Sequence, residues 1–174
     1  LELFPGKVVA VVGENGAGKS TLKNLLIGLL EPNEGYIELE GTRLPNKFHA
    51  ADFGIGAVHQ EFSLFNELTV AENVCIIDLP GAKPLVNWNQ INKVSQKYLD
   101  MVGVDFPSDM VVSNLSTGEQ QQVEIAKALR HASKVLILDE PTTSLTNPER
   151  DHLFNIVRKL RDNGLAIIYI SHFI

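Results

Sequence analysis

Three short apolar runs, rich in valine and isoleucine, are spaced along the chain at Val8–Val12, Val135–Leu138 and Ala166–Ile170. Uninterrupted apolar runs of this length are typical of strands buried on both faces. Segments in which apolar residues recur every three or four positions, the spacing of a helix, lie between them. This alternation predicts an α/β fold around a mainly parallel sheet, with residues 1–174 forming one domain.

Helical spacing predicts three longer helices. One covers Lys19–Leu30, and a second covers Asn87–Val102, where Gly103 closes it. A third ends at Asn163-Gly164, and Pro148 lies in its first turn, where proline is tolerated. The apolar face of this third helix consists of Leu153, Ile156, Val157 and Leu160.

Local signals mark three helix starts and one hairpin. Three Ser/Thr-x-x-Glu pairs can satisfy the free backbone N–H groups of a first helical turn. They are Thr69 with Glu72, Ser116 with Glu119, and Thr146 with Glu149. The alternating pattern of Gly35–Leu39, followed by a turn at Glu40-Gly41, predicts a small half-exposed antiparallel β piece.

Composition narrows the class of ligand. The 174 residues are 44% hydrophobic and 21% charged, an ordinary balance for a soluble domain, and no apolar run is long enough to span a bilayer. The net charge is −6 with no basic run, which argues against nucleic acid as the main ligand. The single cysteine, Cys75, cannot form an internal disulfide, as is usual in a reducing compartment.

The segment after the first apolar run fits the pattern G-x-x-x-x-G-K-[ST]. It reads Gly13, Glu14, Asn15, Gly16, Ala17, Gly18, Lys19, Ser20, followed by Thr21. Glycines let backbone N–H groups curl inward around phosphate oxygens, and the following helix points its positive end at the anion. We predict that Lys19 bridges the β- and γ-phosphates of ATP, Ser20 ligates Mg²⁺ and Thr21 reaches the α-phosphate. The alternative is a glycine-rich turn with a solvated lysine.

The second apolar run leads directly into Asp139-Glu140-Pro141. Adjacent carboxylates at the end of a buried strand are unfavourable unless a cation or a proton balances them. Ligands of parallel sheets bind where strands end, so these residues and the phosphate loop should converge on one site. We predict that Asp139 holds Mg²⁺ opposite Ser20, and that Glu140 orients and deprotonates the attacking water. A solvated acidic turn is the alternative.

Together with Leu115–Gln120, these motifs resemble the ATP-binding domains of ABC transporters over nearly the whole chain. The sequence Leu-Ser-Thr-Gly-Glu-Gln is similar to the signature segment of that family, usually Leu-Ser-Gly-Gly-Gln. The signature residues here are Ser116, Thr117, Gly118 and Glu119. The resemblance implies that they face the γ-phosphate of ATP bound by a partner domain, although the segment is also an ordinary capping box. It also implies a helical signature subdomain, approximately residues 66–130, inserted in the phosphate-loop NTPase core.

Two single residues match the family by position. Gln60 resembles the switch glutamine that follows a strand and would touch Mg²⁺ and the attacking water. His172 resembles the switch histidine that contacts the γ-phosphate, although a histidine at a strand end is more often structural. The resemblance therefore implies a catalytic set of Glu140, His172 and Gln60, and a metal set of Ser20, Gln60 and Asp139.

The finer pattern is similar to the ATPases of ribose- and galactoside-type sugar importers. Val123–Leu129, Pro5-Gly6-Lys7 and Ile167–His172 all resemble that subgroup. Its members fuse two ATPase halves in one chain, and this sequence is most like the first half. Because no initiator Met is present and the sequence stops soon after His172, we expect a chain trimmed at both ends.

Several positions depart from the family pattern. Thr117 and Glu119 replace the usual Gly and Gln of the signature, and Thr146 replaces an Asp that usually makes contacts across a dimer. Thr143–Thr146 otherwise resembles the family segment Ser-Ala-Leu-Asp. The family has an aromatic residue upstream that stacks on adenine, and Phe4 is too close to the loop to match it.

The resemblance implies an ATPase subunit or half-subunit that uses MgATP to drive the import of a sugar. Implied partners are a second ATP-binding domain arranged head to tail, transmembrane permease subunits and, indirectly, a sugar-binding protein. The protein would lie in the cytoplasm against the inner face of the membrane. Two alternatives are a non-transport role in translation or DNA repair, and a truncated nucleotide-binding module without turnover.

Overall fold

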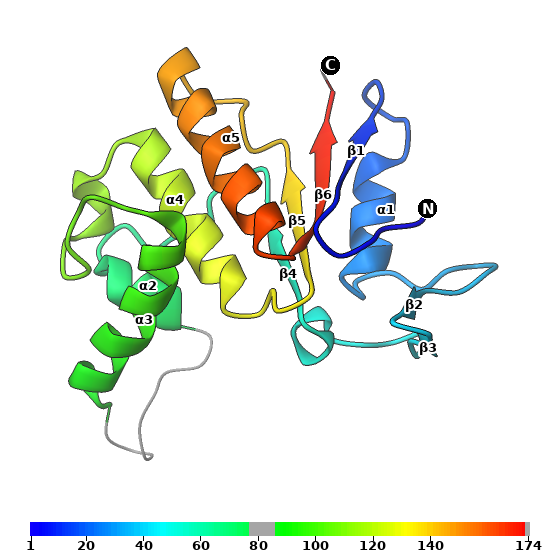
Figure 1. Cartoon of the computed structure of the whole chain (residues 1–174), viewed down its shortest axis with the longest axis horizontal. Helices are drawn as coiled ribbons and strands as arrows, with labels where there is room; N and C mark the ends of the chain where they lie inside the picture. The colour runs from blue at the N-terminus through cyan, green and yellow to red at the C-terminus, as the bar shows by residue number, and fades with distance from the viewer. Residues whose placement is uncertain (77–85, 173–174) are drawn as a thin grey trace.

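A four-stranded parallel sheet forms the centre of the molecule in the computed structural model, which describes residues 1–76 and 86–172. The strands lie in the order β1, β6, β5, β4 (Figure 1). Their bounds are Val8–Val12 for β1, Ala166–Ser171 for β6, Val135–Asp139 for β5 and Ile55–Val58 for β4. The predicted mainly parallel α/β fold is therefore confirmed.

The pairing register brings the carboxyl ends of the strands to one edge of the sheet. Val12 of β1 pairs with Ser171 of β6, and Ile170 of β6 pairs with Asp139 of β5. On the other side of β5, Leu138 pairs with Val58 of β4. Because all four strands run in the same direction, the segments that follow them leave the sheet side by side.

Both faces of β5 are buried, each against a different set of elements. Leu136 and Leu138 belong to a core shared with helices α4 (Thr117–Leu129) and α5 (Asn147–Asp162). The alternate residues of the strand, such as Ile137, join a second core that includes the end of helix α1 (Lys19–Leu26). The alternation of side chains along a strand explains this division, since successive residues point to opposite faces.

A second group of helices lies to one side of the sheet, at the left of Figure 1. Helices α2 (Val70–Cys75) and α3 (Trp88–Val102) pack on each other and on α4, and α3 buries Ile91 and Leu99 completely. Short 3₁₀ segments lie at Ala50–Phe53 (η1) and Val112–Asn114 (η2). The inserted subdomain over approximately 66–130 stays a prediction, and its residues 77–85 lie outside the described part of the chain.

The helix starts follow the local signals in the sequence. All three capping boxes form, at Thr69, Ser116 and Thr146. Asn87 caps α3 through its side chain, and Gly103 ends that helix with a left-handed φ of 81°. Each cap satisfies backbone groups that the first or last turn of a helix leaves unpaired. These predictions are confirmed.

The prediction that Val8–Val12 is buried on both faces is wrong. β1 is an edge strand of the described sheet: its one strand partner there is β6. Val8 and Val12 are 39% and 43% exposed, while Val11 packs against the second core. An apolar run indicates a strand, but its burial depends on what covers it.

The predicted helix over Lys19–Leu30 ends early, at Leu26. Gly28 has a left-handed φ of 78°, and a Cβ there would collide with the carbonyl oxygen of Phe48. Leu29, beyond this break, is exposed. The chain therefore leaves the helix at a glycine that lets another segment approach closely.

The antiparallel piece is confirmed but is shorter than predicted. It pairs β2 (Glu38–Leu39) with β3 (Thr42–Arg43). Glu40 and Gly41 have φ of 52° and 76°, as a tight two-residue hairpin turn requires.

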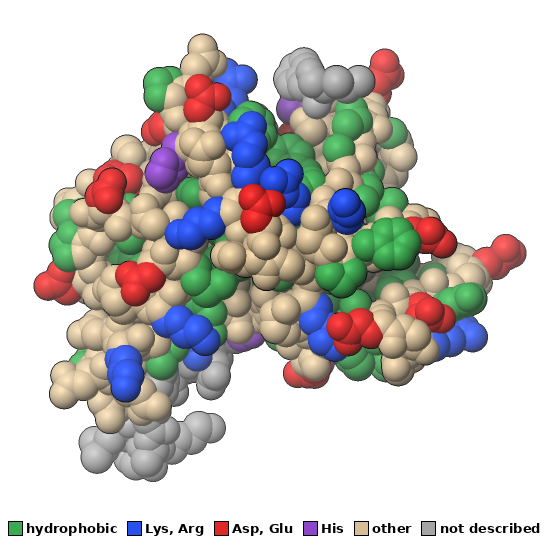
Figure 2. Space-filling view, in the orientation of Figure 1, with side chains coloured by type: hydrophobic (Ala, Val, Ile, Leu, Met, Phe, Trp, Pro, Cys, Tyr) green, Lys and Arg blue, Asp and Glu red, His purple; other side chains and the backbone are tan. Residues whose placement is uncertain are grey.

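Figure 2 shows acidic and basic side chains interspersed over the face in view. Within the described ranges, helices are too short or too polar to cross a bilayer.

Candidate functional site

Segments that follow all four strands of the sheet line one hollow of about 570 Å³. The phosphate-loop segment after β1 contributes most of it, and the loops after β4, β5 and β6 contribute the rest. The lining residues are Asn15, Gly16, Gly18, Lys19, Ser20, Thr21, Gln60, Asp139, Glu140, Thr143 and His172. The structure thus brings the predicted metal and catalytic residues together with six of the nine predicted phosphate-loop residues, while Gly13, Glu14 and Ala17 do not line the hollow.

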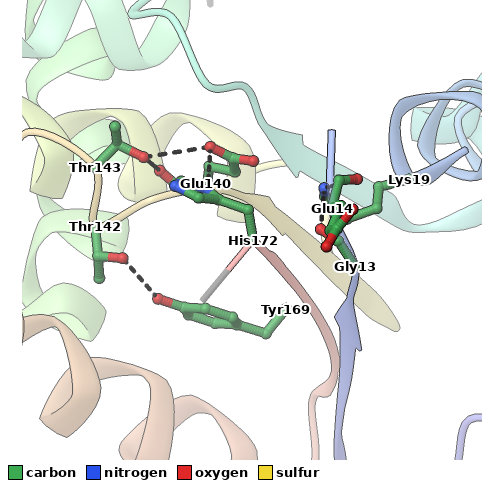
Figure 3. A network of polar contacts seen from close by, with 8 residues as sticks. All are labelled: Gly13, Glu14, Lys19, Glu140, Thr142, Thr143, Tyr169 and His172. Atoms are coloured by element: carbon green, nitrogen blue, oxygen red, sulfur yellow. Dashed lines mark hydrogen bonds and ion pairs between the residues drawn. The ribbon is translucent and has the colours of Figure 1, made fainter. Parts of the chain in front are cut away.

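The phosphate loop has the backbone shape that its glycines predict. Gly16 and Gly18 have φ of 87° and 91°, a region that side-chain-bearing residues rarely adopt, and Gly18 caps the start of α1. Lys19 curls back over the loop, and its Nζ donates to the carbonyl oxygens of Gly13 at 2.6 Å and Glu14 at 3.1 Å (Figure 3). A positive helix end and a lysine ammonium therefore border the hollow, an arrangement suited to phosphate.

The oxygen-bearing side chains of the hollow fit a magnesium ion. Ser20 supplies a hydroxyl, Gln60 an amide oxygen and Asp139, which is buried, a carboxylate. Mg²⁺ prefers oxygen ligands of this kind and usually combines one or two carboxylates with substrate phosphates and water. In the part of the chain that the structure describes, no cluster of three His, Cys, Asp or Glu side chains could hold a metal without such help.

Asp139 has a partner that the sequence analysis did not identify. Lys23 Nζ lies 2.6 Å from Asp139 Oδ2, and the two side chains are 13% and 7% exposed. Lys23 follows Ser20 by three residues on α1, which places both on one side of the helix. The three-residue spacing from Ser20 was the available signal for this lysine, but its partner Asp139 lies 116 residues away in the sequence.

Glu140 and His172 meet at the edge of the hollow. His172 Nδ1 lies 2.9 Å from Glu140 Oε2, and the Thr143 hydroxyl donates to the Glu140 carbonyl at 3.1 Å (Figure 3). The Glu140 N–H donates to the carbonyl of Ile170 at 3.0 Å. Glu140 has a φ of 49°, which costs about 1–3 kcal/mol for a residue with a side chain. The surrounding contacts hold Glu140 in a backbone conformation that is unfavourable for a residue with a side chain, and they fix the direction of its carboxylate.

Behind this pair, Tyr169 supports the loop after β5. Its hydroxyl lies 3.4 Å from the Thr142 hydroxyl, to which it donates (Figure 3). Burial raises the pKa of Tyr169, and the contact with Thr142 opposes that rise. The phenol therefore stays neutral at physiological pH and acts as a fixed donor.

The segment after β4 is fastened to α4 by buried charges. The carboxylate of Glu124 accepts from both the N–H and the hydroxyl of Ser63, and Lys127 Nζ donates to the Ser63 carbonyl at 2.8 Å. Glu124 is 3% exposed and Lys127 9%. His59 lies in the same segment after β4, and its pKa is lowered mainly by burial and secondly by the charge of Lys23. Sequence analysis missed this set, although two charges inside an apolar helical run were a signal.

The signature segment lies away from the phosphate hollow. Ser116 and Glu119 exchange the two hydrogen bonds of a capping box at the start of α4, at 3.3 and 2.7 Å, and Thr117 opens the helix exposed. The N–H of Gly118 donates to Glu149 Oε1 of α5 at 3.1 Å. Ser116, Gly118 and Glu119 border a separate hollow of about 550 Å³. Contact of this segment with a partner's phosphate stays a prediction.

Comparison with known proteins gives one family. The family model described as ABC transporter matches residues 1–143. The chain is 44% identical to the ribose import ATP-binding protein RbsA of Corynebacterium glutamicum, over 99% of this chain and 33% of that protein. It is 40% identical to the arabinose import ATP-binding protein AraG of Mannheimia succiniciproducens, over 97% of this chain and 34% of that protein. The chain thus spans about one third of the length of these curated relatives.

Solved structures agree with the sequence relatives. A nucleotide-free ATP-binding cassette from an ABC transporter superposes with a TM-score of 0.86 at 29% identity, covering 99% of this chain and 73% of that one. The dimeric structure of MJ0796, a bacterial ABC transporter cassette, gives a TM-score of 0.79 at 27% identity, with coverage of 99% and 78%. The fold that positions the hollow is therefore that of an ATP-binding cassette.

The carboxylate of Glu149 should make the stability of the signature region depend on pH. The N–H of Thr146, and next its hydroxyl, hold the pKa of Glu149 below the ordinary value of 4.5, and the Gly118 N–H adds to this while burial opposes it. A carboxyl whose pKa is lower in the folded state stabilises the fold above its unfolded pKa, and this contribution is lost as the pH falls through the folded value.

We therefore expect Glu149→Gln to lower the urea midpoint of unfolding at pH 7 and to match the parent once the pH is well below 4.5. Urea titrations of both proteins at several pH values measure this difference. Glu67→Gln, at an exposed position, is the control. A parent–variant difference that stays constant down to low pH would show that the charge of Glu149 is unimportant.

Proposed function

We propose that this chain, which belongs to the ABC transporter family of ATP-binding cassettes, binds MgATP in the hollow at the strand ends and hydrolyses it to drive sugar import. The observation that carries the proposal is the convergence of the phosphate loop with Asp139 and Glu140 at one edge of the sheet. A phosphate cradle, a magnesium ligand and a base candidate there provide the parts that phosphoryl transfer to water requires.

Binding would begin at the phosphate loop. Lys19 Nζ contacts the carbonyls of Gly13 and Glu14, so its ammonium already lies beside the loop. On binding, phosphate oxygens would replace these carbonyls as its partners. Ser20, Gln60 and Asp139 would hold Mg²⁺. When bound, the ion neutralises charge on the phosphates and orients them. The backbone N–H groups near Gly16 and Gly18 would complete the cradle.

Hydrolysis would centre on Glu140. Its carboxylate would accept a proton from the attacking water as the water oxygen bonds to the γ-phosphorus and the bond to the β-phosphate oxygen breaks. His172, 2.9 Å from Glu140 Oε2, would hold that carboxylate in position and contact the γ-phosphate. Gln60 would orient the water. The roles of His172 and Gln60 are those that the resemblance to the family implies, and their place in the lining of the same hollow as Glu140 supports them.

Assembly would complete the site. The signature residues border a different hollow, so one domain would bind ATP without covering the γ-phosphate. Two domains arranged head to tail would place the Ser116 end of each α4 over the nucleotide of the other, where helix N–H groups can stabilise negative charge. The dimeric cassette structure that this chain resembles supports the association of two domains.

The cargo and the remaining partners are proposed from the relatives. Ribose and arabinose import proteins are 44% and 40% identical to this chain, which supports a sugar importer. Transmembrane permease subunits would then hold the domain at the inner face of the membrane, and a sugar-binding protein would deliver the cargo to them. Neighbouring genes for a permease and a sugar-binding protein would support this assignment.

Lys19→Ala should weaken ATP binding by about tenfold or more, roughly 1.5–3 kcal/mol, because charge-assisted contacts to phosphate are among the strong ones. Titration with a fluorescent ATP analogue in Mg²⁺ measures the dissociation constants. Lys47→Ala, at a lysine 85% exposed and outside the hollow, should bind like the parent. Equal affinity for Lys19→Ala and the parent would rule out the phosphate-loop assignment.

Glu140→Gln should retain nucleotide binding and lose about 10²–10⁴ of the hydrolysis rate, because the amide cannot accept the proton. Gln keeps the size and backbone freedom of Glu, so the unusual φ of 49° should not change. Single-turnover assays with an added second ATPase half should show ATP held uncleaved. Hydrolysis by the variant at the parent rate would mean that another group is the base.

Activity per domain should rise with protein concentration, because the proposed site is shared between two copies. Ser116→Arg should abolish that rise, since a bulky cation would occupy the signature end of α4, while nucleotide affinity stays at the parent value. Phosphate release measured over about a hundredfold range of concentration tests this. Rapid, concentration-independent turnover by a monomer confirmed by light scattering would contradict the shared site.

A further inference from the structure

The pair formed by Lys23 and Asp139 differs from the other lysine–carboxylate pairs described. Its two side chains are 13% and 7% exposed, whereas Lys134 and Glu40, also 2.6 Å apart, are 42% and 62% exposed. An exposed pair contributes little because water screens it. Removing one member of a buried pair instead leaves an uncompensated charge away from water. The charge of Lys23 therefore matters to Asp139.

Lys23 reaches Asp139 from α1 without lining the phosphate hollow. Asp139 belongs to the lining, and Lys23 does not. The contact uses Oδ2 of the carboxylate, so Lys23 engages one of its two oxygens. Lys23 thus contacts the proposed metal ligand Asp139 without lining the hollow, and it lies on the helix that also carries Ser20.

The Lys23–Asp139 pair affects how tightly ATP binds when Mg²⁺ is absent. A buried, unpaired carboxylate in the hollow would repel the phosphates of ATP, and only a metal ion could reverse that repulsion. With Lys23 in place the Asp139 side chain is already neutralised, so metal-free nucleotide meets less repulsion. For the same reason, Mg²⁺ gains less from a carboxylate that a lysine already holds.

We propose that Lys23 is a positioning residue that holds Asp139 and reduces the dependence of nucleotide affinity on Mg²⁺. This inference rests on the proposed MgATP site and deepens it by assigning its metal dependence to one residue. The coupling between two ligands is a free energy that either one can report. The ratio of nucleotide dissociation constants without and with Mg²⁺ therefore measures what Lys23 does.

The decisive variant is Lys23→Gln, which keeps a hydrogen-bond donor for Asp139 but removes the charge. The dissociation constant of a fluorescent ATP analogue is measured in excess EDTA and in saturating Mg²⁺. We expect the EDTA-to-Mg²⁺ ratio to rise by about tenfold or more in Lys23→Gln, because the carboxylate charge becomes uncompensated. Lys23→Arg, which keeps the charge, and Lys134→Gln, which removes the exposed pair of equal length, should give the parent ratio.

A folded Lys23→Gln protein with the parent ratio would overturn the proposal, because a purely structural lysine would change both dissociation constants by the same factor. If Lys23→Gln does not fold, Asp139→Asn is compared with the double variant Lys23→Gln with Asp139→Asn, in which neither buried charge remains. A ratio in the double variant that exceeds the ratio in Asp139→Asn by about tenfold or more, the rise expected for Lys23→Gln itself, would mean that Lys23 acts on the nucleotide directly and would overturn the proposal, and a smaller difference supports action through Asp139. Absence of ATP binding by the parent would instead remove the proposed function itself.

Discussion

The position of β6 between β1 and β5 is the constraint on which the site depends. Because β6 pairs in parallel with both, Val12, Ser171 and Asp139 are held within one register step of each other. A slip of one residue in either pairing would turn alternate side chains to the opposite face of the sheet. The apolar runs of β5 and β6 prevent such a slip, because the buried residues of each strand pack in two separate cores. Core packing thus fixes where the polar residues emerge.

At that edge, the backbone adopts conformations that the fold must support. Gly16 and Gly18 take left-handed φ values where glycine carries little penalty, but Glu140 takes one as a residue with a side chain. Its N–H bonds to the Ile170 carbonyl, and Thr143 and His172 hold the carbonyl and the carboxylate. The rigid sheet supplies these partners, so Glu140, the proposed base, keeps its unfavourable backbone conformation.

Much of the fold was predictable because its signals are local. Apolar runs, capping pairs and the glycine pattern of the phosphate loop each act over a few residues, and the strands, caps and convergent hollow agree with them. Features that depend on distant segments were not predictable in this way. The exposure of β1 depends on what covers the sheet edge, and α1 ends where Phe48 approaches Gly28. The partners of Asp139 and Gly118 lie 116 and 31 residues away.

Helix α4 connects the signature segment with the loop that follows β4. Its first turn carries Ser116 and Gly118, and two turns later Glu124 and Lys127 grip Ser63, three residues beyond Gln60. A helix of 13 residues is a stiff rod about 20 Å long. The loop that bears Gln60 is therefore held, through Ser63, at a fixed distance from the signature segment.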